Sequence, residues 1–308
     1  MYMSKGKAEI LLACVIIARS TSYLLAKLSL SSIGPFNLLA LRFLISFIIL
    51  SIIFYKKLKN TTSCDLFQGV ILGVVLYSIL SLELHGLKTI TSSMASFIEN
   101  TAIVFVPFFE AILLKKLPKV GVVLTTLITL FGVGLLTMEN ASFSFSFGEV
   151  LCFGAAILYA AMIILTAKFS HRGDPITLGI VQIFTVGFLG LISSFIFEQP
   201  HLPSTNEEWA VIMSLALVCT VFGFTFQPLA QKYTSTERAG QFCALNPVTA
   251  AILGWIFLNE SMNKVKILGA LLIIGGVLYT SIRKDDKESD EEQLESHTSK
   301  ESLNKNLQ

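Results

Sequence analysis

The sequence has little charge. Only 14% of its 308 residues are Asp, Glu, Lys or Arg, whereas about 25% is usual in soluble proteins. Hydrophobic residues make up 53% of the chain, and its mean hydropathy is +0.71. Most of the chain must therefore contact lipid or other apolar helices. The net charge of +2 provides no electrostatic basis for binding nucleic acid.

Motifs of several enzyme classes are also missing. The chain has no GxxxxGK[ST] phosphate-binding loop, no HExxH, no CxxC and no GxSxG. Its five cysteines are scattered and lack the spacing of a metal site. The sequence therefore predicts no cofactor, no metal and no ATP hydrolysis through such a loop. A membrane-embedded enzyme is an alternative, but it would need His, Asp or Cys residues clustered at one depth, and the sequence shows no such cluster.

Long apolar runs dominate the chain instead. A run of about 20 apolar residues can cross a bilayer as a helix. We expect an all-α integral membrane protein with ten transmembrane helices, since a helix satisfies its own backbone hydrogen bonds in lipid. The expected spans cover residues 8–29, 35–55, 66–86, 93–114, 119–137, 146–167, 175–197, 208–230, 237–258 and 264–282.

Lysine and arginine residues are distributed unevenly between the two sides of these spans. If the N-terminus is cytoplasmic, the opposite side holds only Lys27, Lys88, Lys264 and Lys266. Positive charge gathers on the cytoplasmic side of membrane proteins, so we expect both termini in the cytoplasm. Residues 284–308 are charged and polar, which predicts a disordered cytoplasmic tail.

The chain contains one unit twice. Residues 82–136 align without a gap to residues 226–280 at a shift of 144, so that Glu83 meets Gln227. Each half of the chain has an odd number of expected spans, five, so the second half enters the membrane from the opposite side. Such inverted repeats are typical of secondary transporters, whose substrate site lies near the midplane between the halves. We assign the first repeat to residues 1–138 and the second to 139–283.

Several short motifs of the second half are distinctive. QKYTS begins at Gln231, NPV at Asn246 and LNE at Leu258, followed by LGA and GG. With them, the chain over about residues 8–283 resembles the EamA family of the drug/metabolite transporter superfamily. The resemblance implies two inverted five-helix repeats that move small metabolites such as amino acids, often outward. Two positions depart from the family pattern: Arg19 replaces a usual Trp, and Asn246 replaces a frequent Glu.

Ionisable side chains inside the expected spans are the first candidates for a site. A charge there costs about 3 kcal/mol by insertion scales and usually faces a partner or a wet cavity. Arg19 and Arg42 lie near the middles of the first two spans, Glu99 lies in the fourth and Glu83 near the outer end of the third. Either arginine could pair with Glu99. A zwitterionic substrate could instead place its carboxylate on Arg19 and its amine on Glu99.

Each of these residues also has a structural alternative. Arg19 and Glu99 could be static partners of other side chains. Glu83 is near enough to the membrane surface for simple solvation to be favoured. For Arg42, which resembles an arginine of the family, a structural role is favoured over a ligand.

Uncharged polar residues inside spans can bind a ligand without the cost of a buried charge. Their alternative role is hydrogen bonding between helices, which contributes only about 0.6 kcal/mol on average in membranes. The substrate-binding residues predicted from the sequence are Arg19, Ser20, Tyr23, Glu83, Glu99, Asn100, Tyr159, Gln227, Gln241 and Asn246.

The sequence thus predicts a secondary transporter in the plasma membrane, an exporter of amino acids working by alternating access. Its partners would be a small polar or zwitterionic metabolite and the lipid bilayer. The alternative cargo is a nucleotide-sugar or another metabolite of the wider superfamily. Proton coupling is left open.

Overall fold

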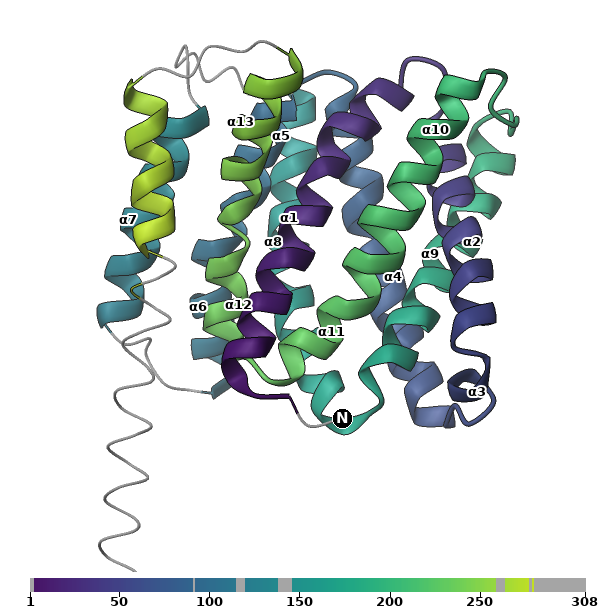
Figure 1. The fold of residues 1–308 in the computed structure, drawn as a ribbon, viewed down its shortest axis with the longest axis horizontal. Helices are drawn as coiled ribbons and strands as arrows, with labels where there is room; N and C mark the ends of the chain where they lie inside the picture. Colours follow the sequence, from purple (N-terminus) through teal and green to yellow (C-terminus); the bar gives the residue numbers. More distant parts are fainter. Residues whose placement is uncertain are drawn as a thin grey trace, which may run out of the picture.

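Apolar helices make up this computed structural model, which describes residues 3–90, 92–114, 120–137, 146–258, 264–276 and 279; none of these residues is in a strand. The helices run side by side along nearly one direction, which gives the bundle two ends (Figure 1). α1 (Lys5–Ser29) begins at the same end as α3 (Tyr55–Leu58), and α10 (Asn206–Ser214) begins at the opposite end.

Among the described residues, six helices are long and apolar enough to cross a membrane by length and composition. They coincide with six of the ten expected spans, so the protein is a multi-pass membrane protein. The six are α1, α2 (Pro35–Ile53), α4 (Ser63–Leu87), α8 (Phe147–Arg172), α9 (Pro175–Phe197) and the continuous helix Asn206–Lys232.

Two of the other expected spans are broken. The fourth is divided into α5 (Ser92–Asn100) and α6 (Ala102–Leu114). The ninth is divided into α12 (Thr236–Phe242) and α13 (Leu245–Leu258). The first break lies at Thr101, whose hydroxyl donates to the carbonyl oxygen of Ile98 (2.6 Å) and so competes with the helical pattern. The second precedes Pro247, which fits the first turn of a helix because no N–H is needed there.

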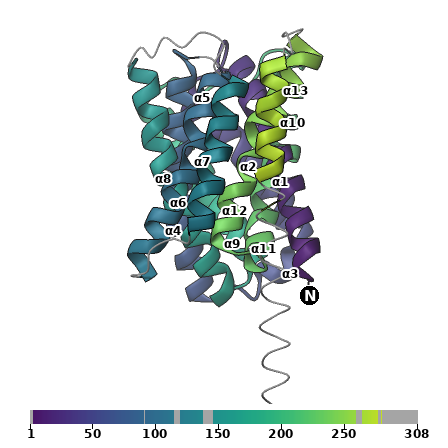
Figure 2. The same cartoon turned by 90° about the vertical axis from the view of Figure 1, so that its left-hand side faces the viewer.

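The two remaining expected spans lie at one edge of the bundle. The fifth is α7 (Val120–Thr137), and residues 264–276 form a helix beside it (Figure 2). A small apolar cluster that includes Val133, Val248 and Ile273 packs both against α13. The count of ten transmembrane helices stays a prediction, and the expected tail lies outside the described residues.

Helix starts follow from capping residues. The Thr62 hydroxyl accepts a hydrogen bond from the N–H of Asp65, and the Asp65 carboxylate accepts one from the N–H of Thr62, which starts α4. Ser146 and Glu149 form the same capping box at α8. Pro35 occupies the first turn of α2, where its missing N–H has no helical partner to lose.

α2 and α9 pack along each other and are tied at both ends. The carboxylate of Glu198, after α9, accepts hydrogen bonds from the N–H groups of Phe36 (3.1 Å) and Asn37 (2.8 Å) at the start of α2. At the opposite end, the Nζ atom of Lys57 lies 2.6 Å from the Oδ1 atom of Asp174, which caps α9. These ties hold together two helices that are far apart in the sequence.

A buried ion pair connects α1 with α12. Arg238 is 1% exposed, and its Nη1 atom donates to the Oε1 atom of Glu9. The main apolar core, which includes Leu12, Phe43 and Leu76, lies between α1, α2, α4, α8 and α9. The polar residues described next lie within this core.

Candidate functional site

Arg19 lies within α1 and is only 9% exposed. Its Nη1 atom donates to the hydroxyl oxygen of Tyr159 (2.7 Å) and to Oε1 of Gln227 (2.8 Å). The guanidinium carbon also lies 4.2 Å from the ring centroid of Phe224 and 5.2 Å from that of Tyr159. Within the described part of the chain, no carboxylate is at ion-pair distance from Arg19. Polar and aromatic contacts therefore hold this cation.

The helix that faces Arg19 has an uncommon geometry. η1 (Leu215–Phe224) is a π-helix between α10 and α11 (Thr225–Lys232). π-helical segments are rare and frequently occur at functional sites. Within η1, a Cβ atom at Gly223 would lie 2.6 Å from the Cγ atom of Arg19. Only a glycine leaves room for the arginine side chain at this contact.

Glu99, at the end of α5, is 3% exposed and accepts a hydrogen bond from the hydroxyl of Tyr23. The sequence raised the possibility of an ion pair between Glu99 and one of the two arginines. The structure instead brings Tyr23 to the carboxylate, while the Nη1 atom of Arg19 is directed to Tyr159 and Gln227. Glu99 and Arg19 remain near enough for their charges to interact.

Glu83 of α4 is buried, with 5% of its surface exposed, so the favoured alternative of simple solvation was wrong. Its charge interacts with those of Glu99, Arg42 and Arg19. No described residue donates a hydrogen bond to its carboxylate. The neighbouring amide of Asn100 donates from Nδ2 to the carbonyl oxygen of Ser96 (2.6 Å), but its Oδ1 has no partner among the described residues.

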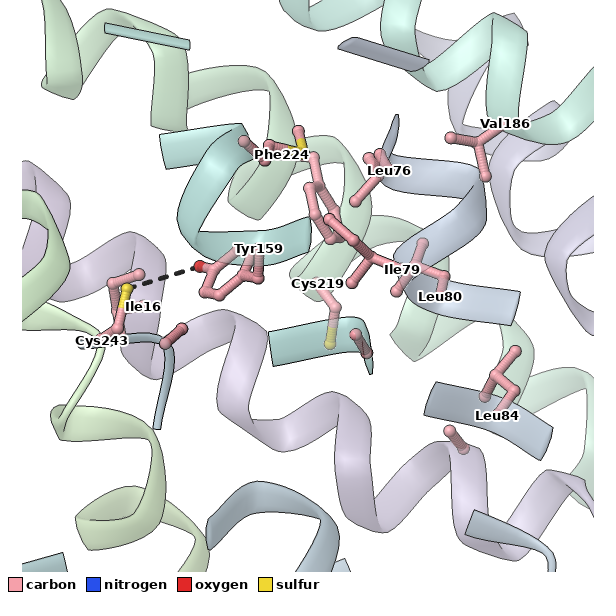
Figure 3. Close-up of a cluster of buried hydrophobic side chains, with 14 of the residues drawn as sticks. Ile16, Leu76, Ile79, Leu80, Leu84, Tyr159, Val186, Cys219, Phe224 and Cys243 are labelled. Atoms are coloured by element: carbon pink, nitrogen blue, oxygen red, sulfur yellow. Dashed lines mark hydrogen bonds between the residues drawn. The ribbon is translucent and has the colours of Figure 1, made fainter. Parts of the chain in front are cut away.

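Two of the remaining predicted residues connect α1 to the second half of the chain. The Ser20 hydroxyl donates to Oδ1 of Asn246 in α13 (2.9 Å). Tyr159 of α8, which contacts Arg19, also accepts a hydrogen bond from the thiol of Cys243 (3.5 Å), as Figure 3 shows. These contacts extend the site from α1 to α13.

Gln241 of α12 is 2% exposed and contacts α7. Its Nε2 atom donates to the hydroxyl of Thr125 in α7 (3.2 Å) and lies 3.5 Å from that of Thr126. These contacts join α12 to α7.

Sequence reasoning favoured a structural role for Arg42 of α2 and left it out of the predicted substrate-binding residues. Arg42 is 2% exposed, and its Nε atom donates to the hydroxyl of Thr220 in η1 (2.6 Å). Its guanidinium carbon lies 5.8 Å from the Phe224 ring centroid and 5.2 Å from that of Phe43. The charge of Arg42 within an apolar span was a visible signal. No such signal marked Phe224, because nothing in the sequence distinguishes it from the rest of the 24 phenylalanines in the chain.

Several buried polar atoms at this site have no partner among the described residues. The unpaired donors are Nε of Arg19, Nη2 of Arg42 and Nε2 of Gln227. Oδ1 of Asn100 is an acceptor without a donor, and the carboxylate of the buried Glu83 lies in the same region. Buried polar groups are normally hydrogen-bonded, so these atoms are available to bind a polar molecule. The described residues contain no group of three or more His, Cys, Asp and Glu that could hold a metal.

The sequence is similar to known transporters. The EamA-like transporter family matches it over residues 6–138 and 146–282. An uncharacterized transporter of Archaeoglobus fulgidus is 26% identical over 286 residues, which cover 91% of this chain and 99% of that protein. The threonine/homoserine exporter RhtA of Escherichia coli (strain K12) is 26% identical over 277 residues, which cover 85% and 88%.

The fold is similar to that of a known crystal structure. Its TM-score with this protein is 0.76, and the match covers 92% of this chain and 100% of that chain. The two sequences are 18% identical. At this identity the likeness concerns the fold alone.

Proposed function

Since this chain belongs to the EamA-like transporter family, we propose that it carries a small zwitterionic metabolite, an amino acid in the first place, across the membrane. It is a transporter of that family rather than an enzyme. The proposal rests on the buried site, in which unpaired donors of Arg19 and Gln227 are accompanied by the unpaired Oδ1 of Asn100 and the buried carboxylate of Glu83.

An amino acid matches both kinds of group. Its carboxylate would accept hydrogen bonds from the guanidinium of Arg19 and the amide of Gln227, and bonds to a charged donor are stronger than neutral ones. Its ammonium would lie near Glu83, Glu99 and Asn100. The substrate would thus pair charges whose isolation in a low-dielectric interior is costly.

The transport cycle we propose is alternating access between two inverted halves, residues 1–138 and 139–283. The sequence repeat supports it, and so do the two helix breaks. At a shift of 144, Thr101 of the first break corresponds to Leu245, where α13 begins after the second break. Interrupted helices at the substrate site are common in secondary transporters.

The proposed direction is export, through the plasma membrane and with both termini in the cytoplasm. The similarity to an exporter of threonine and homoserine supports amino acids as cargo. Nucleotide-sugars are the alternative cargo.

The test is a thermal-shift screen of the detergent-purified protein with amino acids, organic cations and nucleotide-sugars. A ligand at 100 times its dissociation constant stabilises a protein by about 2.7 kcal/mol, so amino acids should raise the melting temperature. Arg19→Ala and Glu99→Gln should abolish this shift. Arg172→Ala, which removes an exposed arginine at the end of α8, is the control that should keep it.

Flux measurements complete the test. Proteoliposomes that contain the protein should release labelled L-threonine faster than protein-free vesicles, and the Arg19→Ala protein should not. Stabilisation by nucleotide-sugars alone would replace the amino acid as cargo. If amino acids stabilise Arg19→Ala as well as the original protein, the zwitterion site is wrong.

A further inference from the structure

Arg42 lies in the same part of the core as Arg19, on α2, and both α1 and α2 pack against η1. We propose that Arg42 is a second ligand of the substrate carboxylate and that the two arginines together make the site select α-carboxylates. The inference rests on the proposed function and adds to it a specificity-determining residue that the sequence had assigned to structure.

The two guanidinium groups share one aromatic ring. The guanidinium carbons of Arg19 and Arg42 lie 4.2 and 5.8 Å from the Phe224 ring centroid. A ring face attracts a cation, so Phe224 holds both groups in one region of the core. The two positive charges also repel each other, and an anion bound near both would relieve that repulsion.

Neither guanidinium has an acidic partner at ion-pair distance among the described residues. The Nε atom of Arg42 donates to the hydroxyl of Thr220, and its buried Nη2 has no hydrogen-bond partner among the described residues. The Nε atom of Arg19 and the Nε2 atom of Gln227 are unpaired as well. A carboxylate has two oxygens and about four lone-pair positions, enough to accept from all three donors.

The π-helix supplies the parts that hold the two arginines. Thr220 accepts from Arg42, Gly223 leaves room for Arg19, and Phe224 supplies the shared ring. The carbonyl oxygen of Phe224 in turn accepts a hydrogen bond from Nε2 of Gln182 in α9 (3.2 Å). Three contacts from one short segment of uncommon geometry converge on the pair, which is more than packing of an apolar helix requires.

This arrangement predicts selection by the carboxylate itself. Replacing the carboxylate of an amino acid by a carboxamide keeps its size and its ammonium but removes the negative charge that two guanidinium groups attract. The ammonium end, near Glu83 and Asn100, would be unaffected. The quantity that reports on Arg42 is therefore the ratio of the affinities for an amino acid and its amide.

The experiment measures binding of L-threonine and L-threoninamide to the purified, full-length protein. A hydrogen bond to a charged group contributes about 1.5–3 kcal/mol, so Arg42→Gln should lower the threonine-to-amide preference by about 10- to 100-fold. Arg42→Lys keeps the charge but not the fork of donors and should lower the preference less. If Arg42→Gln does not fold, the Arg42→Lys protein provides the test of the same preference.

The matched control is Ser46→Ala. Ser46 lies four residues after Arg42 on α2, and its single O–H is within hydrogen-bond distance of the carbonyl oxygens of Arg42 (2.7 Å) and Ala216 (3.0 Å). This variant loosens the contact between α2 and η1 without removing a guanidinium, so the preference should stay the same. A change in Ser46→Ala as large as that in Arg42→Gln would show that packing, not charge, sets the preference, and would overturn the proposal.

Two further outcomes separate this proposal from the proposed function. If Arg19→Ala loses threonine binding while both Arg42 variants keep the original preference, the zwitterion site stands and the second ligand is wrong. If the unaltered protein binds no amino acid, both are wrong.

Discussion

A single glycine sets how closely the π-helix approaches the arginine of α1. At Gly223, a Cβ atom would come within 2.6 Å of the Cγ atom of Arg19, closer than two carbon atoms can approach without a shift. Because Cγ is near the backbone, Arg19 cannot avoid the contact by moving only its end. A methyl group at this position therefore displaces the guanidinium from Tyr159 and Gln227.

We expect Gly223→Ala to weaken amino-acid binding by roughly tenfold, the equivalent of one hydrogen bond to a charged group. Isothermal titration of the purified protein measures the change. Gly154→Ala in α8 is the control, because its Cβ atom would meet only Leu82 Cδ1 at 3.6 Å, an ordinary contact. Equal affinities in the two variants would contradict the role given to Gly223.

At the start of α9, Asp174 shows that the beginning of a helix depends on residues outside that helix. Its carboxylate caps α9 by accepting from the N–H of Thr177 (3.0 Å), and it pairs with Lys57 (2.6 Å). Burial alone would raise the pKa of Asp174. The hydrogen bonds from Lys57 and Thr177 outweigh burial, so this pKa lies below its ordinary value of 3.8.

A carboxyl group with a lowered pKa stabilises the folded protein above its unfolded pKa and stops doing so as the pH falls through the folded pKa. We expect Asp174→Asn to lower the melting temperature at about pH 7, by an amount that shrinks as the pH falls below about 4 and through the lowered pKa of the folded protein. The effect should stay below about 1 kcal/mol because the pair is partly exposed.

Asparagine caps a helix as well as aspartate does, so this substitution isolates the charge. Asp174→Ala removes both charge and cap and should lower the melting temperature at neutral and at acidic pH. Melting curves in detergent, recorded across this range, distinguish the two. An Asp174→Asn defect of the same size at both ends of the range would rule out the ionised carboxylate as its cause.

For the whole molecule, the arrangement of helix ends predicts which loops share a side of the membrane. α4 begins at the same end as α1, and α10 begins at the other end (Figure 1). Cys64, at the start of α4, is exposed. With the N-terminus in the cytoplasm, Cys64 should be protected in intact cells, while a cysteine introduced before α10 should face outward.

Labelling with a membrane-impermeant maleimide checks this orientation. The unaltered protein should react at Cys64 only after the cells are permeabilised. Ser204→Cys, made together with Cys64→Ser, should react in intact cells. The reverse pattern would invert the proposed topology, and reaction of both positions in intact cells would contradict the assignment of the two ends to opposite sides.

The sequence by itself determined the class of protein and much of its layout. Hydropathy is a local property that depends on which residues are neighbours in the chain, so the six long spans could be located to within a few residues. The resemblance of the QKYTS and NPV motifs to the EamA family was confirmed by the family match. The same rule on buried charge that singled out Arg19 and Glu99 also singled out Arg42.

Only the tertiary structure decided how those residues meet. Tyr23 contacts Glu99, Arg19 turns to Tyr159 and Gln227, and Arg42 reaches a phenylalanine of η1. Each of these contacts joins helices that are far apart in the chain, so no local pattern encodes it. The π-helical geometry of Leu215–Phe224 was also decided by the tertiary structure. The geometry of a helix at a contact depends on the side chains packed against it, and these belong to other helices.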